Sequence, residues 1–258
     1  MSSNYKVQGE QSEKQIRIPH SEIRILLWDI DGTLLIAPRG GSYKDYFAPA
    51  MERVYGSSGI LRGQLKVSGM TDLQIAFESL QPEGFSVEQI SAKAEEFCLA
   101  IGEEIERICA PEESRFVALP GAREVLEATD AHPRFVNGLL TGNLPLAARF
   151  KLEFVGLHKF FDFSLGAFGN ESHRRIDLPA VAARNVSAKF DYEFAPSQFI
   201  VLGDTPSDIA CARHFGAKAV AVATGRNHPA ETLVPHKPDY LLNNLTDPAE
   251  VLRVLENL

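Results

Sequence analysis

The sequence predicts an α/β fold: a doubly wound parallel sheet covered by helices, with an all-helical segment inserted after the first strand. Short apolar runs, typical of strands buried on both faces, recur along the chain. Segments with helical spacing alternate with these runs, as right-handed crossover connections require. The alternation stops between residues 42 and 118, where only helical patterns are found. A chain of 258 residues is long enough to bury a sizeable core.

The strands are expected at six apolar runs. The first, residues 23–28, ends in an Asp-x-Asp-Gly-Thr turn, which marks the end of a strand. The later runs are residues 135–140, 163–168, 199–202 and 219–223, with a short edge strand at 239–242.

Helices are expected between these strands, because apolar residues there recur at helical spacing. The predicted helices are residues 121–129, 146–154, 178–185, 206–215 and 248–255. Their alternation with the strands predicts a Rossmann-like core made of residues 22–41 and 119–258.

Residues 42–118 are predicted to form a helical domain inserted into this core, which the family resemblance described below identifies as a cap domain. Tyr43, Phe47, Ala50 and Val54 keep helical spacing. Capping boxes are expected at residues 71–74 and 86–89, and the second opens an apolar stripe that continues to residue 108. Residues 1–21 are polar and are expected to be a flexible tail.

The composition of the chain limits the binding partners and the cellular location that we expect for the protein. The 34 acidic residues outnumber the 26 basic ones, giving a net charge of -8, which argues against a nucleic-acid partner. A small phosphorylated metabolite remains a possible partner, because its binding needs positive charge only at the binding site. We expect no membrane span and no secretory signal, because no apolar segment reaches about 20 residues and the first twenty residues are polar. Three cysteines without C-x-x-C spacing favour free thiols in a reducing compartment, and the cytoplasm is the expected location. We expect the protein to be either a monomer or a homodimer.

Three turns after predicted strands carry the chemistry. They are residues 29–33 (Asp-Ile-Asp-Gly-Thr), 141–143 (Thr-Gly-Asn) and 203–208 (Gly-Asp-Thr-Pro-Ser-Asp). The carboxyl ends of parallel strands meet at one edge of a doubly wound sheet, so we expect these turns to converge. Converging carboxylates repel unless a cation lies among them, and Mg²⁺ prefers hard oxygen ligands.

The metal is expected to bind the Asp29 carboxylate, the backbone carbonyl of Asp31 and the Asp204 carboxylate. Asp208 is expected either to bind the metal directly or to contact the residues that bind it. Taken singly, each turn has an ordinary structural explanation: Asp-Gly is a common turn, and Thr205 with Pro206 makes a good helix start. Their combination is what indicates a functional site.

These residues resemble the haloacid dehalogenase-like superfamily, in its branch of phosphoglycolate phosphatase-like enzymes with a helical cap inserted after the first motif. The resemblance covers residues 23–258. The third motif of that family is a basic residue, usually lysine. Here the expected window offers Arg174 and Arg175. Arg175 is favoured because Asp177 and Leu178 begin the next helix just after it, but both remain open.

The resemblance implies the roles of the residues. Asp29 would be the nucleophile that forms an aspartyl-phosphate, and Asp31 the general acid and then the general base. Thr141, Gly142, Asn143 and Arg175 would bind the phosphoryl group. Asp29, Asp31, Asp204 and Asp208 would hold Mg²⁺.

The resemblance therefore implies a Mg²⁺-dependent phosphate monoester hydrolase. A departing halide needs no proton, so the presence of Asp31 favours phosphatases over dehalogenases of the same family, and Thr33 is also more like the phosphatases. A sugar phosphomutase and a non-catalytic phosphometabolite-binding protein are the alternatives. The segment 69–72 of the cap either faces the pocket or is a plain helix start, and the second interpretation is favoured.

Overall fold

A parallel sheet lies at the centre of the molecule. The computed structural model describes residues 18–37, 44–62, 65–110 and 116–258. Within these ranges the five-stranded sheet has the order β4-β1-β5-β6-β7, and all its pairs are parallel. Its strands are β1 (Arg24–Trp28), β4 (Phe135–Leu139), β5 (Phe199–Gly203), β6 (Lys218–Val222) and β7 (Tyr240–Leu242). The predicted α/β fold is confirmed.

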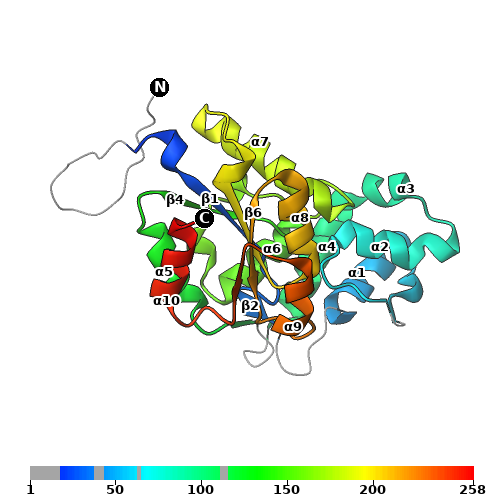
Figure 1. Cartoon of the computed structure of the whole chain (residues 1–258). Helices are drawn as coiled ribbons and strands as arrows, with labels where there is room; N and C mark the ends of the chain where they lie inside the picture. The colour runs from blue at the N-terminus through cyan, green and yellow to red at the C-terminus, as the bar shows by residue number, and fades with distance from the viewer. Residues whose placement is uncertain (1–17, 38–43, 63–64, 111–115) are drawn as a thin grey trace.

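Helices cover both faces of this sheet, as Figure 1 shows. One face is covered by α5 and α10, which pack against each other, and the other by α7 and α8. Their bounds are Ala122–Asp130 for α5, Leu178–Phe190 for α7, Pro206–Phe215 for α8 and Pro248–Glu256 for α10. The short α9 (Ala230–Leu233) precedes β7.

Alternate residues of β1 contribute to two separate cores. Leu26 and Trp28 belong to the cluster on the α5 and α10 side, whereas Ile25 and Leu27 belong to the cluster on the α7 and α8 side. Successive side chains of a strand point to opposite faces, so a strand buried on both sides must be apolar throughout. This burial explains the continuous apolar runs of the sequence.

The strand predicted at residues 163–168 is wrong. Phe163–Leu165 form a 3-10 helix, and only Ala167 makes an isolated bridge, to Leu140. The side chain of Asp162 accepts a hydrogen bond from the Ser164 N–H and so begins a turn. The run is apolar because it packs into both cores, with Phe163 and Phe168 on one side and Leu165 and Ala167 on the other, while only Ala167 pairs with the end of β4.

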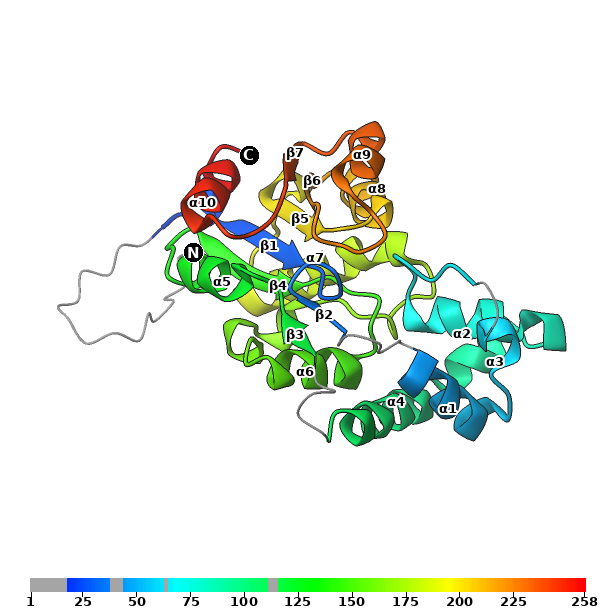
Figure 2. The ribbon, with the colours of Figure 1, turned by 90° about the horizontal axis from the view of Figure 1, so that it is seen from below.

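The inserted segment forms a group of helices at one end of the molecule (blue through cyan to green in Figure 2, labelled α1 to α4). Its helices are α1 (Lys44–Tyr55), α2 (Asp72–Leu80), α3 (Val87–Ala92) and α4 (Ala94–Ile108). A small antiparallel pair joins β2 (Leu35–Ile36) to β3 (Val117–Ala118) where the chain leaves and re-enters the core. The expectation of helix alone up to residue 118 therefore misses β3. The division into domains stays a prediction.

Local signals in this segment explain where its helices begin and end. Ser86 forms a complete capping box, whereas Thr71 accepts from the Gln74 N–H but the Gln74 side chain bonds Glu78 instead. The apolar stripe predicted to continue to residue 108 is split between α3 and α4 at Lys93, whose ammonium donates to the Val54 carbonyl.

The inserted helices pack on the core through α4 and α6 (Pro145–Phe154). A side-chain carbon at Gly102 of α4 would approach Phe150 of α6 to 3.1 Å, so the two helices are in close contact. The apolar cluster of the α5 side continues without a break into this interface and on to Phe47 and Phe97.

The predicted tail falls mostly outside the described residues, which begin at residue 18, and so does Tyr43 of the first inserted helix. His20–Glu22 form a 3-10 helix, and the Gln198 side chain donates to the His20 carbonyl at 2.8 Å. In the described part of the chain, no helix is both long and apolar enough to cross a bilayer. All three cysteines are free thiols, with Cys98 half-buried and the other two buried.

Candidate active site

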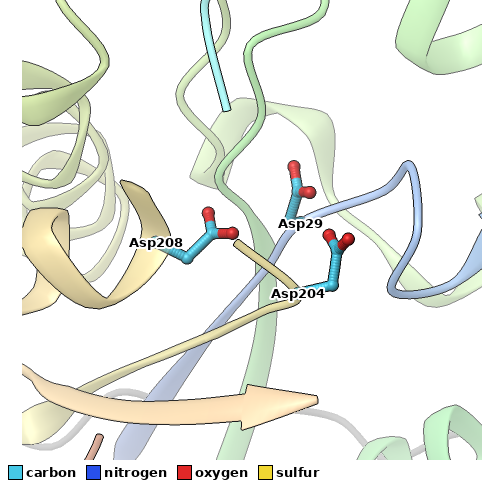
Figure 3. A group of neighbouring side chains, drawn as sticks. All are labelled: Asp29, Asp204 and Asp208. Atoms are coloured by element: carbon cyan, nitrogen blue, oxygen red, sulfur yellow. The ribbon is translucent and has the colours of Figure 1, made fainter. Parts of the chain in front are cut away.

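Three buried carboxylates meet at the carboxyl edge of the sheet (Figure 3). Asp29 follows β1, Asp204 follows β5, and Asp208 lies in the first turn of α8. Each offers an oxygen atom within 4.8 Å of the others. Adjacent strands bring them together, since β1 and β5 are neighbours and the Asp29 N–H donates to the Leu202 carbonyl at 2.9 Å.

Arg175 is the cation of this cluster. One of its terminal nitrogens lies 2.8 Å from Asp29 Oδ1 and 2.6 Å from Asp208 Oδ1. The residue begins a 3-10 turn that leads directly into α7 and is buried. The Arg174 side chain is 59% exposed and lies 3.7 Å from Asp177. Of the two arginines that the sequence left open, the structure brings Arg175 to the carboxylates and leaves Arg174 at the surface.

The carboxylates are held in an environment that disfavours their charge. Burial raises the pKa of Asp29 to about 7, although Arg175 opposes this shift. Burial, Asp29 and Asp208 together raise the pKa of Asp204 well above its usual value. A single guanidinium therefore does not compensate three buried acids, and the cluster favours a further positive charge.

The donor set fits a divalent cation that binds oxygen. Among the described residues Asp204 forms no ion pair, although it is only 5% exposed. The backbone also comes close to this carboxylate: Gly32 has a φ of +89°, and a side-chain carbon there would lie 2.4 Å from Asp204 Oδ2, so only glycine fits at this position. Buried carboxylates whose oxygens lie within 4.8 Å of one another are hard ligands of the kind that Mg²⁺ prefers.

Asp208 differs from the other two carboxylates because both its oxygens are engaged. Oδ1 is bonded by Arg175, while Oδ2 accepts from the Thr205 N–H at 3.0 Å and the Thr205 hydroxyl at 2.7 Å. It therefore holds Arg175 and the start of α8 in place. Its direct binding to a metal stays a prediction.

The loop after β4 places a hydroxyl beside these acids. Thr141 is fully buried, and its Oγ1 accepts from both the backbone N–H of Asn143 (3.2 Å) and its side-chain amide (2.7 Å). These are accepted bonds, so the Thr141 hydroxyl proton is left to donate. Asn143 was expected to bind the phosphoryl group. Its N–H and its side-chain amide both donate to other residues of the site, so that contact stays a prediction.

The segment 69–72 touches the same loop. The Asp72 N–H donates to the Gly142 carbonyl at 2.7 Å, and the Asp72 carboxylate accepts from the Leu144 N–H at 2.8 Å. A side-chain carbon at Gly142 would lie 2.1 Å from the Met70 carbonyl, so only glycine permits this approach. The two interpretations of the segment both hold, because it begins α2 at Thr71 and it also lines the cavity.

One cavity of about 430 Å³ unites these groups. From the core it is lined by Asp29, Asp31, Thr141, Gly142, Asn143, Arg175 and Asp204. From the inserted helices it is lined by Tyr46, Phe47, Met70, Asp72 and Ile75. Residues far apart in the chain thus enclose one polar site with a partly apolar wall.

Sequence reasoning missed two charged residues that line this cavity, Lys151 and Arg226. Lys151 is 1% exposed and bonds both oxygens of Asp31. The sequence did contain a sign of this role, because Lys151 falls at helical spacing on the apolar face of α6 with Ala147, Ala148 and Leu152. A lysine on the apolar face of a helix must have a charged partner. Asp72 also lines the cavity, and it lies in the segment 69–72, for which the sequence favoured a plain helix start.

We expect replacement of Asp72 by asparagine to stabilise the protein above neutral pH. Burial raises the pKa of Asp72 to about 7, which is higher than its usual value. The folded state therefore binds the proton more tightly than the unfolded state, and stability falls as pH rises from about 4 to about 7. Asparagine keeps the acceptor for the Leu144 N–H without the charge. The gain should be about 1–3 kcal/mol at pH 8 and vanish near pH 4.

Thermal unfolding of both proteins between pH 4 and pH 8 measures this difference. The Asp72→Ala variant, which loses the acceptor, should be less stable than the asparagine variant at every pH. A stability difference between wild type and the asparagine variant that does not change with pH would contradict the burial argument.

Comparison with known proteins agrees with this arrangement. A model of the haloacid dehalogenase-like hydrolase family matches residues 26–213, and a HAD-hydrolase-like model matches residues 179–248. A phosphoglycolate phosphatase of Vibrio vulnificus strain YJ016 is 23% identical over 90% of this chain and 97% of its own length.

Solved structures share the fold. A predicted phosphoglycolate phosphatase from Haemophilus somnus has a TM-score of 0.57 at 19% identity, over 90% of this chain and 98% of its own. A β-phosphoglucomutase from Clostridium difficile has a TM-score of 0.61 at 17% identity, over 91% of this chain and 97% of its own. At these identities the two structures show a common fold, and the chemistry must be argued from the side chains.

Proposed function

The chain belongs to the haloacid dehalogenase-like hydrolase family, and on that premise we propose that it hydrolyses a phosphate monoester of a small metabolite through an aspartyl-phosphate intermediate. The observation that carries the proposal is the shared cavity, where Asp29, Asp31 and Arg175 face the same space. The relatives named phosphoglycolate phosphatase support a small anionic substrate of this class.

The phosphoryl group is proposed to bind between Thr141 and Arg175. Thr141 has a hydroxyl proton to donate, because its two hydrogen bonds to Asn143 are accepted ones. The Nε–H of Arg175 is buried and has no acceptor among the described residues, so a phosphoryl oxygen would supply a charge-assisted bond. Asp29, Asp204 and Asp208, with the Asp31 carbonyl, would hold Mg²⁺, whose charge shields the phosphoryl oxygens from the attacking carboxylate.

Two displacements at phosphorus follow. A carboxylate oxygen of Asp29 attacks phosphorus, the bond to the leaving oxygen breaks, and Asp31 gives that oxygen a proton. Asp31 then takes a proton from a water molecule that attacks the aspartyl-phosphate. Inorganic phosphate leaves, and Asp29 is regenerated.

Phosphate release from a panel of esters in Mg²⁺ tests the proposal. The panel contains 2-phosphoglycolate, a sugar phosphate, a nucleoside monophosphate and p-nitrophenyl phosphate. Hydrolysis of at least one ester supports the proposal. Release of phosphate from none of them, with or without Mg²⁺, would refute it.

A phosphomutase is the second candidate, since solved β-phosphoglucomutases share the fold. The same reactions distinguish it, because a mutase would interconvert sugar phosphates without releasing inorganic phosphate.

Replacing Asp204 by asparagine is expected to weaken the binding of Mg²⁺ in a measurable way. Asp204 has no ion pair among the described residues, so its carboxylate has the most to gain from a bound cation. The Mg²⁺ concentration that gives half the maximal rate should rise at least about tenfold. A titration of the rate with Mg²⁺ measures it, and the exposed Asp130→Asn variant is the control. An unchanged half-saturation point would exclude Asp204 as a ligand.

A further inference from the structure

Lys151 is a buried cation that the mechanism above does not use. It lies on α6, one residue from Leu152, and is 1% exposed. An ammonium in such a place is stable only if it is paired and hydrogen-bonded. Burial alone would lower the pKa of Lys151, but Asp31, Tyr46 and Asp72 raise it above its usual value, so the residue is charged.

The ammonium group of Lys151 holds the Asp31 carboxylate by both oxygens. Nζ lies 3.0 Å from Asp31 Oδ1 and 2.8 Å from Asp31 Oδ2. Its third contact is the side-chain oxygen of Asn143, at 2.6 Å. The rings of Tyr46 and Phe116 also lie near the ammonium, each with its centre 5.4 Å from Nζ. The three polar contacts use all three donors of the ammonium.

Asn143 closes this network. Because its oxygen accepts from Lys151, its amide nitrogen must point the other way, where it donates to Asp31 Oδ2 at 2.7 Å and to Thr141 Oγ1 at 2.7 Å. Lys151 thus fixes the orientation of the amide that links Asp31 to Thr141. These are the two residues that would contact the leaving oxygen and the phosphoryl group.

Asp31 needs such support more than its neighbours do. Its side chain is 43% exposed and faces the cavity, whereas the Asp29 side chain is 6% exposed and is held by Arg175. A half-exposed carboxylate on a turn has several accessible rotamers. Proton transfer requires the donor within hydrogen-bond reach of the leaving oxygen, so the rotamer has to be selected before substrate binds.

We propose that Lys151 is the positioning residue for Asp31: through its paired contacts with Asp31 and Asn143 it fixes the carboxylate that exchanges protons with the leaving group. The inference rests on the proposed function. It assigns to a residue of α6, the helix after β4, a part in catalysis that acts through Asp31.

The test compares two esters whose leaving groups differ in their need for a proton. An alkyl phosphate from the panel releases a basic alkoxide that must be protonated, whereas p-nitrophenyl phosphate releases a weakly basic phenolate. We expect Lys151→Met to lower kcat/KM for the alkyl ester by about 100-fold or more and for p-nitrophenyl phosphate by less than about tenfold. The parameter kcat/KM is used because it covers the steps up to departure of the leaving group.

Two controls separate positioning from a general structural effect. Arg149→Met alters an exposed cation of the same helix and should leave both substrates unaffected. Adding Lys151→Met to Asp31→Asn should cost no further activity on the alkyl ester, since Lys151 acts through Asp31. Equal losses on both esters, or a further large loss in the double variant, would overturn the inference. The double variant removes both charges, so it also tests the claim if Lys151→Met alone folds poorly.

Crystals of wild type and Lys151→Met give an answer that does not depend on activity. One Asp31 conformer in the wild type and several in the variant support the inference, and the same single conformer in both overturns it. If the wild type hydrolyses no ester, the proposed function is wrong, while this comparison still decides whether Lys151 positions Asp31.

Discussion

Replacing Asp29 by asparagine is expected to lower kcat for every hydrolysed ester by roughly four orders of magnitude or more, as removal of a nucleophile does. The new side chain would keep the shape of the old one and its place after β1, but an amide oxygen does not form a phosphoryl ester that water can hydrolyse. The loss should be the same for alkyl and aryl phosphates, because both need the same attacking atom.

The fold should survive this change. Asp29 is one of three buried acids, and burial raises its pKa to about 7, so an uncharged residue relieves repulsion. We expect the melting temperature to stay the same or rise. Phosphate release and thermal unfolding are measured on one preparation, with Asp130→Asn as a remote control. Full activity of a folded Asp29→Asn protein would refute the nucleophilic role.

The turns that carry chemistry were predictable because they are local. A turn such as 29–33 follows an apolar strand directly, and in a parallel sheet the ends of neighbouring strands must meet. Sequence alone therefore brings Asp29 and Asp204 to one edge. It could also place Arg175 near them, because the start of α7 lies at the same edge, but it could not decide between two adjacent arginines. The two arginines differ in burial, and burial depends on how the whole chain packs rather than on the local sequence.

The errors come from interactions that a sequence pattern does not contain. Residues 163–168 are apolar enough for a strand, but the Asp162 side chain turns the chain there. The stripe that ends at residue 108 is divided between two helices at Lys93, where the ammonium donates to a carbonyl of α1. Lys151 escaped notice because its partner, Asp31, is 120 residues away in the chain. Long-range pairing of polar groups is not visible as periodicity.

Removal of the Arg175 guanidinium is expected to damage both stability and activity. The Arg175→Met variant leaves Asp29 and Asp208 buried without their common cation, and breaking a buried pair in this way costs about 3–5 kcal/mol. The phosphoryl group also loses a positive charge, so kcat should fall by roughly three orders of magnitude. Thermal unfolding and phosphate release measure the two effects.

If the methionine variant folds poorly, the Arg175→Lys variant still tests the role of the positive charge at this position. A single nitrogen of Arg175 contacts both carboxylates, at 2.8 Å and 2.6 Å, so one ammonium placed there can serve the same two partners. We therefore expect the lysine variant to keep most of the stability and much more activity than the methionine variant. It loses the buried Nε–H, and the remaining deficit measures what that donor contributes. The Arg174→Met variant, altered at an exposed side chain, should resemble wild type. If it is instead the more damaging change, the basic residue of this site has been assigned to the wrong arginine.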